Sequence, residues 1–303
     1  MNRKSFLRSS AFTLGYLALS NQRLLAGMLQ RAPENIKMLT DEIGIFTDKG
    51  GTILFYLSKG GNVVVDAQWP EQAGLLIDEI KKKNNAGFEL LINTHHHLDN
   101  TSGNSAFKGV VKNILAHENS KFNQIQNAKI MKAEGKYVYP DLTYKTSWSE
   151  KFGKEHICVY HYGAAHTSGD SIVHFERADI LHMGDLVFNR RHAGIDRSGG
   201  ANIKNWIEVL GKIYADFGRR TRFVYGRSGD GFDVVGNKED LKAFSNYLSL
   251  LLSYVQTEIK RGKTRKEILK ATAVPGTPEW RSGNIERTLA AVYEELTFEA
   301  PET

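Results

Sequence analysis

The sequence predicts a mixed α/β (α+β) fold, and three features of the 303-residue chain support this prediction. Short apolar runs separated by glycine pairs fill the first part of the chain, which is typical of strands. The middle part alternates such runs with segments whose apolar residues recur at helical spacing. The last third has helical spacing almost throughout. Apolar residues make up 41% of the chain, enough for a sizeable core.

The expected elements follow in order along the chain. A strand meander is expected at 43–46, 53–57 and 63–65, with breaks at Gly50-Gly51 and Gly60-Gly61. Further strands are expected at 88–92, 110–115, 156–162, 171–176, 180–183 and 222–225. Helices are expected at 72–83, 119–134, 202–216 (with Asn202 as N-cap), 238–261 and 285–296. The segment 135–149 has little periodicity and three tyrosines, so we expect a loop flanking the functional site.

The most informative stretch is 93–100, NTHHHLDN, which follows the strand-like run at 88–92. Alternate side chains of an extended segment share a face, so His95 and His97 can reach one metal ion and Asp99 continues the row. Imidazole with carboxylate is a common ligand set for zinc and is also compatible with iron. His96 should point to the opposite face.

Segment 94–104, THHHLDNTSGN, resembles the T-H-x-H-x-D-H signature of the metallo-β-lactamase superfamily. Later motifs appear in the family's order: AHEN at 116–119, HTSGD at 166–170 and HMGD at 182–185. The resemblance covers about residues 38–296. It implies a single domain with a four-layer αββα sandwich, a metal centre at one edge and a helical C-terminal part at 237–296.

The resemblance also implies the ligand set. In the family, three histidines hold one metal, and here these are His95, His97 and His166. A later aspartate, here Asp185, commonly bridges to a second metal. That second metal takes the aspartate corresponding to Asp99, the histidine that follows it, and a late histidine.

This chain departs from the family pattern at two of the second metal's ligands. Asn100 stands where the adjacent histidine is expected, and Arg227, in YGRSG at 225–229, stands where the late histidine is expected. Arginine stays protonated and offers no lone pair, and asparagine is a poor ligand. We therefore expect one ion, zinc or alternatively iron, with a degenerate second site. Asn100 and Arg227 would serve as replacement or substrate-binding groups, because a guanidinium pairs well with carboxylates.

Three histidines around zinc leave one position for water, whose pKa zinc lowers to roughly 7. Hydroxide would then be available near neutral pH, and Asp99 is the candidate general base. The sequence thus favours a mono-zinc hydrolase acting on a small-molecule ester, lactone, amide (including a β-lactam) or thioester. Two alternatives stay open. One is a mono-iron oxygenase resembling persulfide dioxygenases, and the other is a non-catalytic ligand-binding protein with an eroded metal site. Thr167 and Asp170 are expected to shape the turn beside His166.

The N-terminus predicts export. Residues 2–8, NRKSFLR, resemble a twin-arginine signal, and an apolar region at 11–19 ends near a small-x-small cleavage site. We therefore expect residues 1–20 to be a signal and the mature protein to be periplasmic; without a functional signal it would be cytoplasmic. The single Cys158 allows no intrachain disulfide and is expected in the core.

Charge and hydropathy limit the partners. The formal charge is +6, and +3 once the first twenty residues are set aside, which is too small to indicate nucleic-acid binding. No stretch has the length of uninterrupted apolar sequence that a spanning helix needs. Neither the substrate nor the oligomeric state can be inferred from the sequence.

Overall fold

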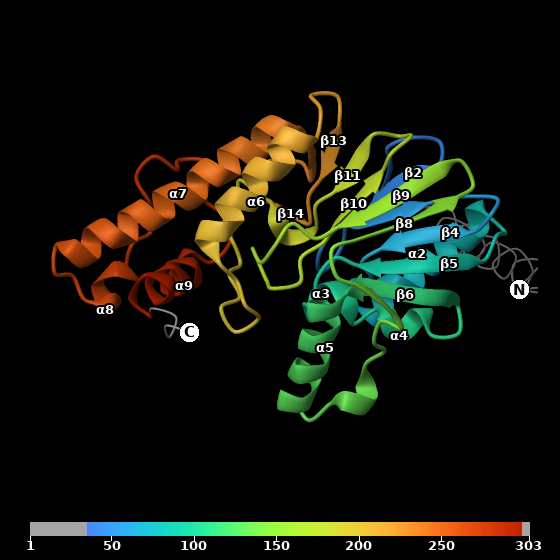
Figure 1. Cartoon of the computed structure of the whole chain (residues 1–303), viewed down its shortest axis with the longest axis horizontal. Helices are drawn as coiled ribbons and strands as arrows, with labels where there is room; N and C mark the ends of the chain where they lie inside the picture. Colours follow the sequence, from blue (N-terminus) through green and yellow to red (C-terminus); the bar gives the residue numbers. More distant parts are fainter. Residues whose placement is uncertain (1–34, 299–303) are drawn as a thin grey trace, which may run out of the picture. The chain divides into compact units, whose positions relative to one another are not determined.

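The computed structural model describes residues 35–298, and from Lys37 onward the described chain forms one compact unit built around two sheets (Figure 1). The first sheet has the strand order β1-β2-β3-β4-β5-β6-β7. Its strands are β1 (Ile36–Met38), β2 (Ile43–Phe46), β3 (Ile53–Tyr56), β4 (Asn62–Val65), β5 (Phe88–Asn93), β6 (Val111–His117) and β7 (Leu142–Tyr144).

The second sheet has the order β15-β13-β11-β10-β9-β8. Its strands are β8 (Ser147–Phe152), β9 (Glu155–Tyr160), β10 (Ile172–Phe175), β11 (Ile180–His182), β13 (Arg222–Val224) and β15 (Val235–Gly236). A small third sheet pairs β12 (Phe188–Asn189) with β14 (Arg227–Ser228).

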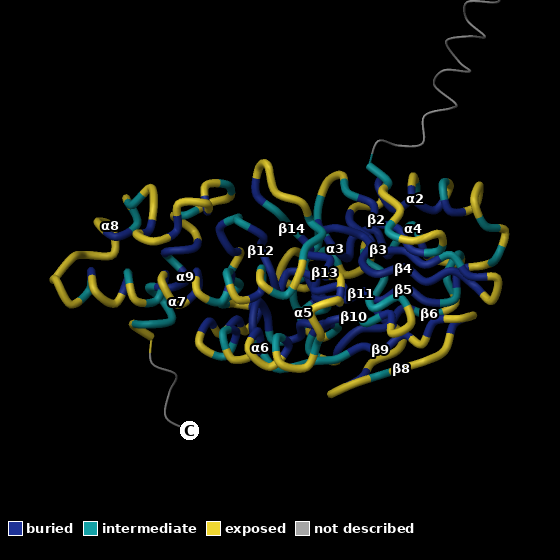
Figure 2. Tube along the Cα trace, turned by 90° about the horizontal axis from the view of Figure 1, so that it is seen from above, coloured by how far each residue is buried: buried dark blue, intermediate teal, exposed yellow. Residues whose placement is uncertain are grey.

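Alternation along the strands places one face of each sheet in a shared core. Leu54 and Tyr56 on β3 meet Val173 and Phe175 on β10 in this core between the sheets. The neighbouring Ile172 belongs instead to a separate cluster under the helices of the second sheet. Since side chains alternate across a strand, both faces of the second sheet are covered. Figure 2 shows the strands β2–β6 buried, whereas the edge strand β8 is largely exposed.

The helices form the outer layers. They are α2 (Pro70–Lys83), α3 (Leu98–Thr101), α4 (Asn104–Phe107), α5 (Glu118–Ile130), α6 (Ile203–Asp216), α7 (Lys238–Lys260), α8 (Arg265–Ile268) and α9 (Ile285–Thr297), with short 3₁₀ turns at Glu134–Lys136 and Gly184–Leu186. The long helix α7 packs against both α6 and α9; the three are yellow, orange and red in Figure 1. Two sheets face to face with helices outside give the expected four-layer αββα arrangement.

Local sequence explains where the site-bearing helices begin. Asn202 caps α6 by accepting a hydrogen bond from the Asn205 backbone N–H, as expected. Asn237 and Asp240 form a reciprocal capping box at the start of α7. The carboxylate of Glu295, on α9, accepts hydrogen bonds from the backbone N–H groups of Ile203 and Lys204. This acid at the positive end of α6 fixes the last helix to the middle of the chain.

Two expectations need comment. The expected loop at 135–149 is wrong in part, because Leu142–Tyr144 and the start of β8 are edge strands of the two sheets. Most residues of both strands are exposed, so neither shows the alternation of apolar and polar residues that marks a half-buried strand. The expected signal at residues 1–20 lies outside the described residues. Within residues 35–298, no helix is both long enough and apolar enough to span a bilayer.

Candidate metal centre

Parallel pairing of β4 with β5 brings the histidine segment to the edge of the first sheet. Val65 pairs with Ile92, so Asp66, just after β4, lies beside Thr94, just after β5. The Asp66 carboxylate accepts hydrogen bonds from the Thr94 backbone N–H and hydroxyl, each at 2.8 Å. The chain then turns into α3, with Asp99 and Asn100 in its first turn. Because Thr94 is fixed at two atoms, the following histidines have a defined direction.

Three imidazole rings converge on one point. The Nδ1 atom of His97 lies 3.1 Å from Nε2 of His95 and 3.0 Å from Nε2 of His166. The other nitrogen of each ring faces an oxygen: Thr94 Oγ1 for His95, Asp196 Oδ2 for His97 and the Gly194 carbonyl for His166, at 2.8–3.0 Å. If each of these outer nitrogens carries the proton, the three inner nitrogens present lone pairs to one another.

The protonation preferences of the rings agree with this arrangement. Burial lowers the pKa of His166 to about 3 and holds the pKa of His95 well below its ordinary value, so both rings are neutral near pH 7. Burial also opposes the charged form of His97, but the hydrogen bond to Asp196 and the negative charges of Asp196, Asp185 and Asp99 together raise its pKa. The proton that Asp196 favours is the one on Nε2, opposite the converging Nδ1.

The donor set fits a transition-metal ion. His97 Nδ1 lies 3.0–3.1 Å from the inner nitrogens of His95 and His166, and lone pairs at this spacing repel unless a cation or a shared proton lies between them. Ligands about 2.0–2.1 Å from a tetrahedral zinc ion are separated by about 3.3 Å, close to the observed spacing. Asp185 adds a carboxylate whose Oδ2 lies 3.8 Å from His166 Nε2. His95, His97, His166 and Asp185 each offer a ligand atom within 4.8 Å of the others.

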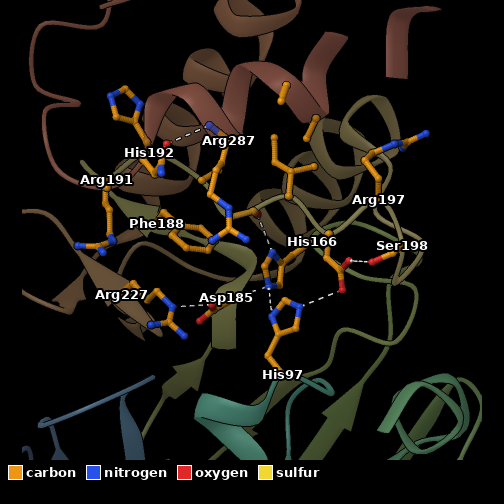
Figure 3. A pocket seen from close by; sticks show the side chains of 18 of the residues that line it. His97, His166, Asp185, Phe188, Arg191, His192, Arg197, Ser198, Arg227 and Arg287 are labelled. Atoms are coloured by element: carbon orange, nitrogen blue, oxygen red, sulfur yellow. Dashed lines mark hydrogen bonds and ion pairs between the residues drawn. The ribbon is translucent and has the colours of Figure 1, made fainter. Parts of the chain in front are cut away.

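Arg227 occupies the space beside this group. Its Nε lies 2.7 Å from Asp185 Oδ2 (Figure 3), and its Nη2 lies 2.5 Å from Asp99 Oδ2 and 3.3 Å from Asn100 Oδ1. Parallel pairing of β12 with β14 sets its position, with Arg227 opposite Phe188. The guanidinium at one departure from the family pattern thus contacts the asparagine at the other. A Cβ at Gly226 would lie 2.1 Å from Asp185 Oδ1, so only glycine allows this close approach.

Arg227 and Asp185 each stabilise the charged form of the other. Burial alone would raise the pKa of Asp185, but the guanidinium holds it below its usual value. Burial likewise disfavours the charge on Arg227, but Asp185 and Asp99 raise its pKa above the ordinary range. Asn100 is completely buried, and its side-chain amide donates to Asp66 Oδ2 at 3.0 Å. Burial raises the pKa of Asp66 to about 7.

A cavity of about 740 Å³ opens over the centre. His97, His166, Asp99, Asp185 and Arg227 line its floor, and segment 191–198 with the start of α9 forms its walls (Figure 3). The stretch 191–196 lines this cavity along its whole length.

A family model for the metallo-beta-lactamase superfamily matches residues 47–250. The chain belongs to the metallo-beta-lactamase superfamily. Members of this superfamily are generally metal-dependent hydrolases, and His95, His97, His166 and Asp185 form a group that could hold a metal ion.

The chain is also similar to individual members of the superfamily and to solved structures. Metallo-beta-lactamase IND-1 from Chryseobacterium indologenes is 26% identical over 186 residues, covering 60% of this chain and 74% of the relative. A metallo-beta-lactamase structure from Pontibacter korlensis matches with a TM-score of 0.59 at 20% identity, covering 71% of this chain and 98% of that one. A double mutant of the sec-alkyl sulfatase PisA1 matches with a TM-score of 0.68 at 13% identity, covering 87% of this chain and 50% of that one.

The structure brings together all seven site residues expected from the sequence. It also adds groups that the sequence did not reveal, namely Asp66, Asp196 and the Gly194 carbonyl, each of which fixes a histidine or its neighbour. Asp66 follows a buried strand adjacent to the histidine strand, and this was the signal available. Asp196 had none, since 99 residues separate it from His97.

Four further side chains that the sequence analysis considered lie outside the proposed ligand group. The Thr167 hydroxyl donates to Asp170 Oδ1 at 2.7 Å, so these residues shape the turn as expected. His96 lies 3.1 Å from Asp196 Oδ2, outside the ligand group, without an aligned hydrogen bond. Cys158 is buried and unpaired, as expected of a core residue.

Proposed function

We propose that this protein is a mono-zinc hydrolase of small-molecule substrates, in which Arg227 replaces the second metal. The observation that carries the proposal is the contrast between converging lone pairs at His95, His97 and His166 and a guanidinium between Asp99 and Asp185. The first set needs a cation, and the second already contains one. Asp185 would face the ion while remaining paired with Arg227.

The chain's own residues would have distinct roles in hydrolysis. A zinc ion bound by the three histidines would supply a Lewis acid and acidify a water molecule near pH 7. Asp99 lines the cavity, and its Oδ2 is the oxygen that contacts Arg227, which leaves Oδ1 to orient water and accept its proton. Arg227 would keep Asp185 charged and hold Asp99 in place. The cavity walls would position the substrate's carbonyl over the histidines.

Metal titration tests the proposal directly. Purified protein should bind close to one zinc per chain by elemental analysis after removal of loosely bound metal. The double variant Asn100→His with Arg227→His should bind two, because it restores both family ligands, whereas either single variant should bind one. Two tightly bound ions in the wild type would contradict the proposal, as would an unchanged stoichiometry in the double variant.

Metal identity separates this proposal from the two alternatives. One iron per chain would favour an oxygenase resembling persulfide dioxygenases, and no metal would favour a ligand-binding protein with an eroded centre. The substrate panel should include esters, lactones, amides, β-lactams and thioesters. Because the sec-alkyl sulfatase match extends over 87% of this chain, alkyl sulfate esters belong in the same panel.

The proposal includes export to the periplasm, supported by the basic segment and apolar region in residues 1–20. Mature protein from the producing cell should lack roughly this segment when its N-terminus is sequenced. A cytosolic form that begins at Met1 would show that the segment is not a signal.

A further inference from the structure

We propose that the cavity binds substrates carrying an anionic group, with Arg191 and Arg287 as the receptor for that group. This inference rests on the proposed hydrolase function and names its substrate class. The shared chemistry is an oxyanion, such as a carboxylate, sulfate or phosphate, at a distance from the bond that is cleaved.

The distribution of charge in the cavity carries the inference. The lining contains four arginines and four acids, so its formal charge is balanced: Arg191, Arg197, Arg227 and Arg287 against Asp99, Asp185, Asp196 and Glu294. The acids, however, all have partners. Arg227 pairs with Asp99 and Asp185, Asp196 contacts two histidines, and Glu294 pairs with Arg265 outside the cavity.

Of the four arginines, two are paired with acids and two are not. Arg227 is neutralised on the floor, and Arg197 pairs with Glu295 at 2.8 Å. Among residues 35–298, the guanidinium groups of Arg191 and Arg287 have neither an ion-pair nor a hydrogen-bond partner. Three of the four acids are thus paired with groups at the proposed metal centre, and the uncompensated positive charge of the lining belongs to Arg191 and Arg287.

The backbone holds these two arginines in fixed relation to each other and to the histidines. Arg191 forms a β-bridge with Ser282, and the His192 backbone N–H donates to the Ser282 carbonyl at 2.8 Å. The buried hydroxyl of Thr288, next to Arg287 on α9, donates to the Ala193 carbonyl at 2.7 Å.

The next residue along, Gly194, accepts the hydrogen bond from His166 Nδ1 at 2.8 Å. One short segment, 191–194, thus connects α9 to a proposed metal ligand. Because the backbone of both arginines is already ordered, ligand binding has only side-chain freedom to restrict.

The side chain of Arg287 extends from α9 into the cavity, whose lining also includes Phe188 and His166 (Figure 3). A planar guanidinium makes two parallel hydrogen bonds to an oxyanion, which Lys could not match. A neutral substrate in this position would displace water from two cations without replacing it, and that desolvation is unfavourable. An anionic substrate would offset this loss.

Anion binding to the metal-free protein tests the receptor without requiring catalysis. Sodium sulfate, sodium phosphate and sodium acetate should be titrated separately by calorimetry, at ionic strength held constant with chloride. At least one should bind saturably, and binding should weaken about 10-fold or more in Arg287→Gln and in Arg191→Gln, the range expected for losing a charged hydrogen bond. Which anion binds best distinguishes carboxylate from sulfate or phosphate substrates.

Arg220→Gln is the matched control, because Arg220 is an exposed arginine outside the cavity lining and should bind like the wild type. Arg287→Lys should fall between the wild type and Arg287→Gln. The inference is overturned if none of the three anions binds saturably, or if binding is as tight in both glutamine variants as in the wild type.

A pair of esters relates the receptor to the zinc-loaded protein. The ratio of kcat/KM for 4-nitrophenyl hydrogen succinate to that for 4-nitrophenyl acetate should fall about 10-fold in Arg287→Gln and stay unchanged in Arg220→Gln. If neither ester is cleaved although the metal-free protein binds anions, ester hydrolysis fails and the receptor stands. If both are cleaved with an unchanged ratio and no anion binds, the receptor fails and the hydrolase stands.

Discussion

The two halves of the centre each gather electron-rich groups in a buried place, and they differ in the cation that balances those groups. On one side, His97 Nδ1 lies 3.1 Å from His95 Nε2 and 3.0 Å from His166 Nε2, and in the proposed function an ion from solution completes this group. On the other side, Asp99 and Asp185 are already completed by Arg227, a cation that belongs to the chain. In this proposal the first half depends on metal supply, whereas the second is complete once the protein folds.

This difference teaches that the loss of a metal ligand need not leave a defect. Replacing a histidine by alanine in a two-metal centre would leave carboxylates facing each other in a buried site. Here Arg227 supplies charge and donors, and Asn100 hydrogen-bonds both to it and to Asp66. The predictions below test each half, from the largest expected effect to the smallest.

The largest effect is expected for His166→Ala in the histidine half. Losing a direct ligand should weaken zinc binding by more than about 100-fold, beyond the 10–100-fold typical of losing a ligand's hydrogen-bond partner. Competition with a chromogenic chelator measures the affinity. His96→Ala is the control, because His96 lies outside the ligand group. Equal zinc affinity in both variants would remove His166 from the ligand set.

The arginine half should respond in stability rather than in metal affinity. Arg227→Ala should destabilise the metal-free protein by about 2–4 kcal/mol, since it leaves the buried Asp185 carboxylate unpaired. Urea unfolding measures this difference. Arg177→Ala, which removes an exposed pair with Glu42, should change stability by less than about 1 kcal/mol. A silent Arg227→Ala would mean that this arginine is merely a surface residue.

Acid should weaken the arginine half through His182. Its Nε2 lies 2.9 Å from the Thr52 carbonyl, and its Nδ1 accepts the Gly184 N–H, which supports the turns carrying Asp185 and Arg227. Burial lowers the pKa of His182 to about 4. As pH falls below about 6.5, His182 binds a proton in the unfolded chain but stays neutral in the folded chain. The free energy of unfolding therefore decreases until about pH 4, where the folded chain also binds the proton.

The pH dependence due to His182 can be measured by comparing the wild type with a variant that lacks this ring. Between pH 7 and pH 4 the metal-free wild type should lose up to about 3 kcal/mol more stability than His182→Gln, which has no titrating ring. Urea unfolding at several pH values gives both curves. Parallel curves would show that His182 is not responsible for acid sensitivity in this region.

The smallest effect is expected for Asp196→Asn, which keeps the shape of the side chain but removes its charge. Asp196 fixes His97 so that Nδ1 faces the centre, and zinc affinity should fall by about 10–100-fold. The d–d spectrum of the cobalt-substituted protein should change as well, which a purely structural loss would not cause. Asp230→Asn, at an exposed turn residue, is the control. Unchanged affinity and spectrum in Asp196→Asn would contradict this role.

The sequence was sufficient for the parts of the site that follow directly from local pattern. His95 and His97 alternate after a buried strand, and Arg227 stands where the family pattern has a histidine. All three residues could therefore be identified from the sequence alone. Asp196 and Arg287 could not. Asp196 contacts His97 across 99 residues of chain, and the hydrogen bond that fixes α9 beside the segment of Arg191, from Thr288 to Ala193, spans 95 residues. The edge strands at 142–152 were missed because most of their residues are exposed, so neither strand has an alternating apolar pattern.

The attachment of α9 has a consequence for the order of folding. Glu295 caps α6 from 92 residues away, and Thr288 holds the segment that orients His166. During synthesis these contacts cannot form until α9 has left the ribosome, although the strands of both sheets lie earlier in the chain. Stalled nascent chains that end before residue 285 should therefore contain protected strands but bind zinc poorly. Competence for metal would then require that synthesis has passed α9.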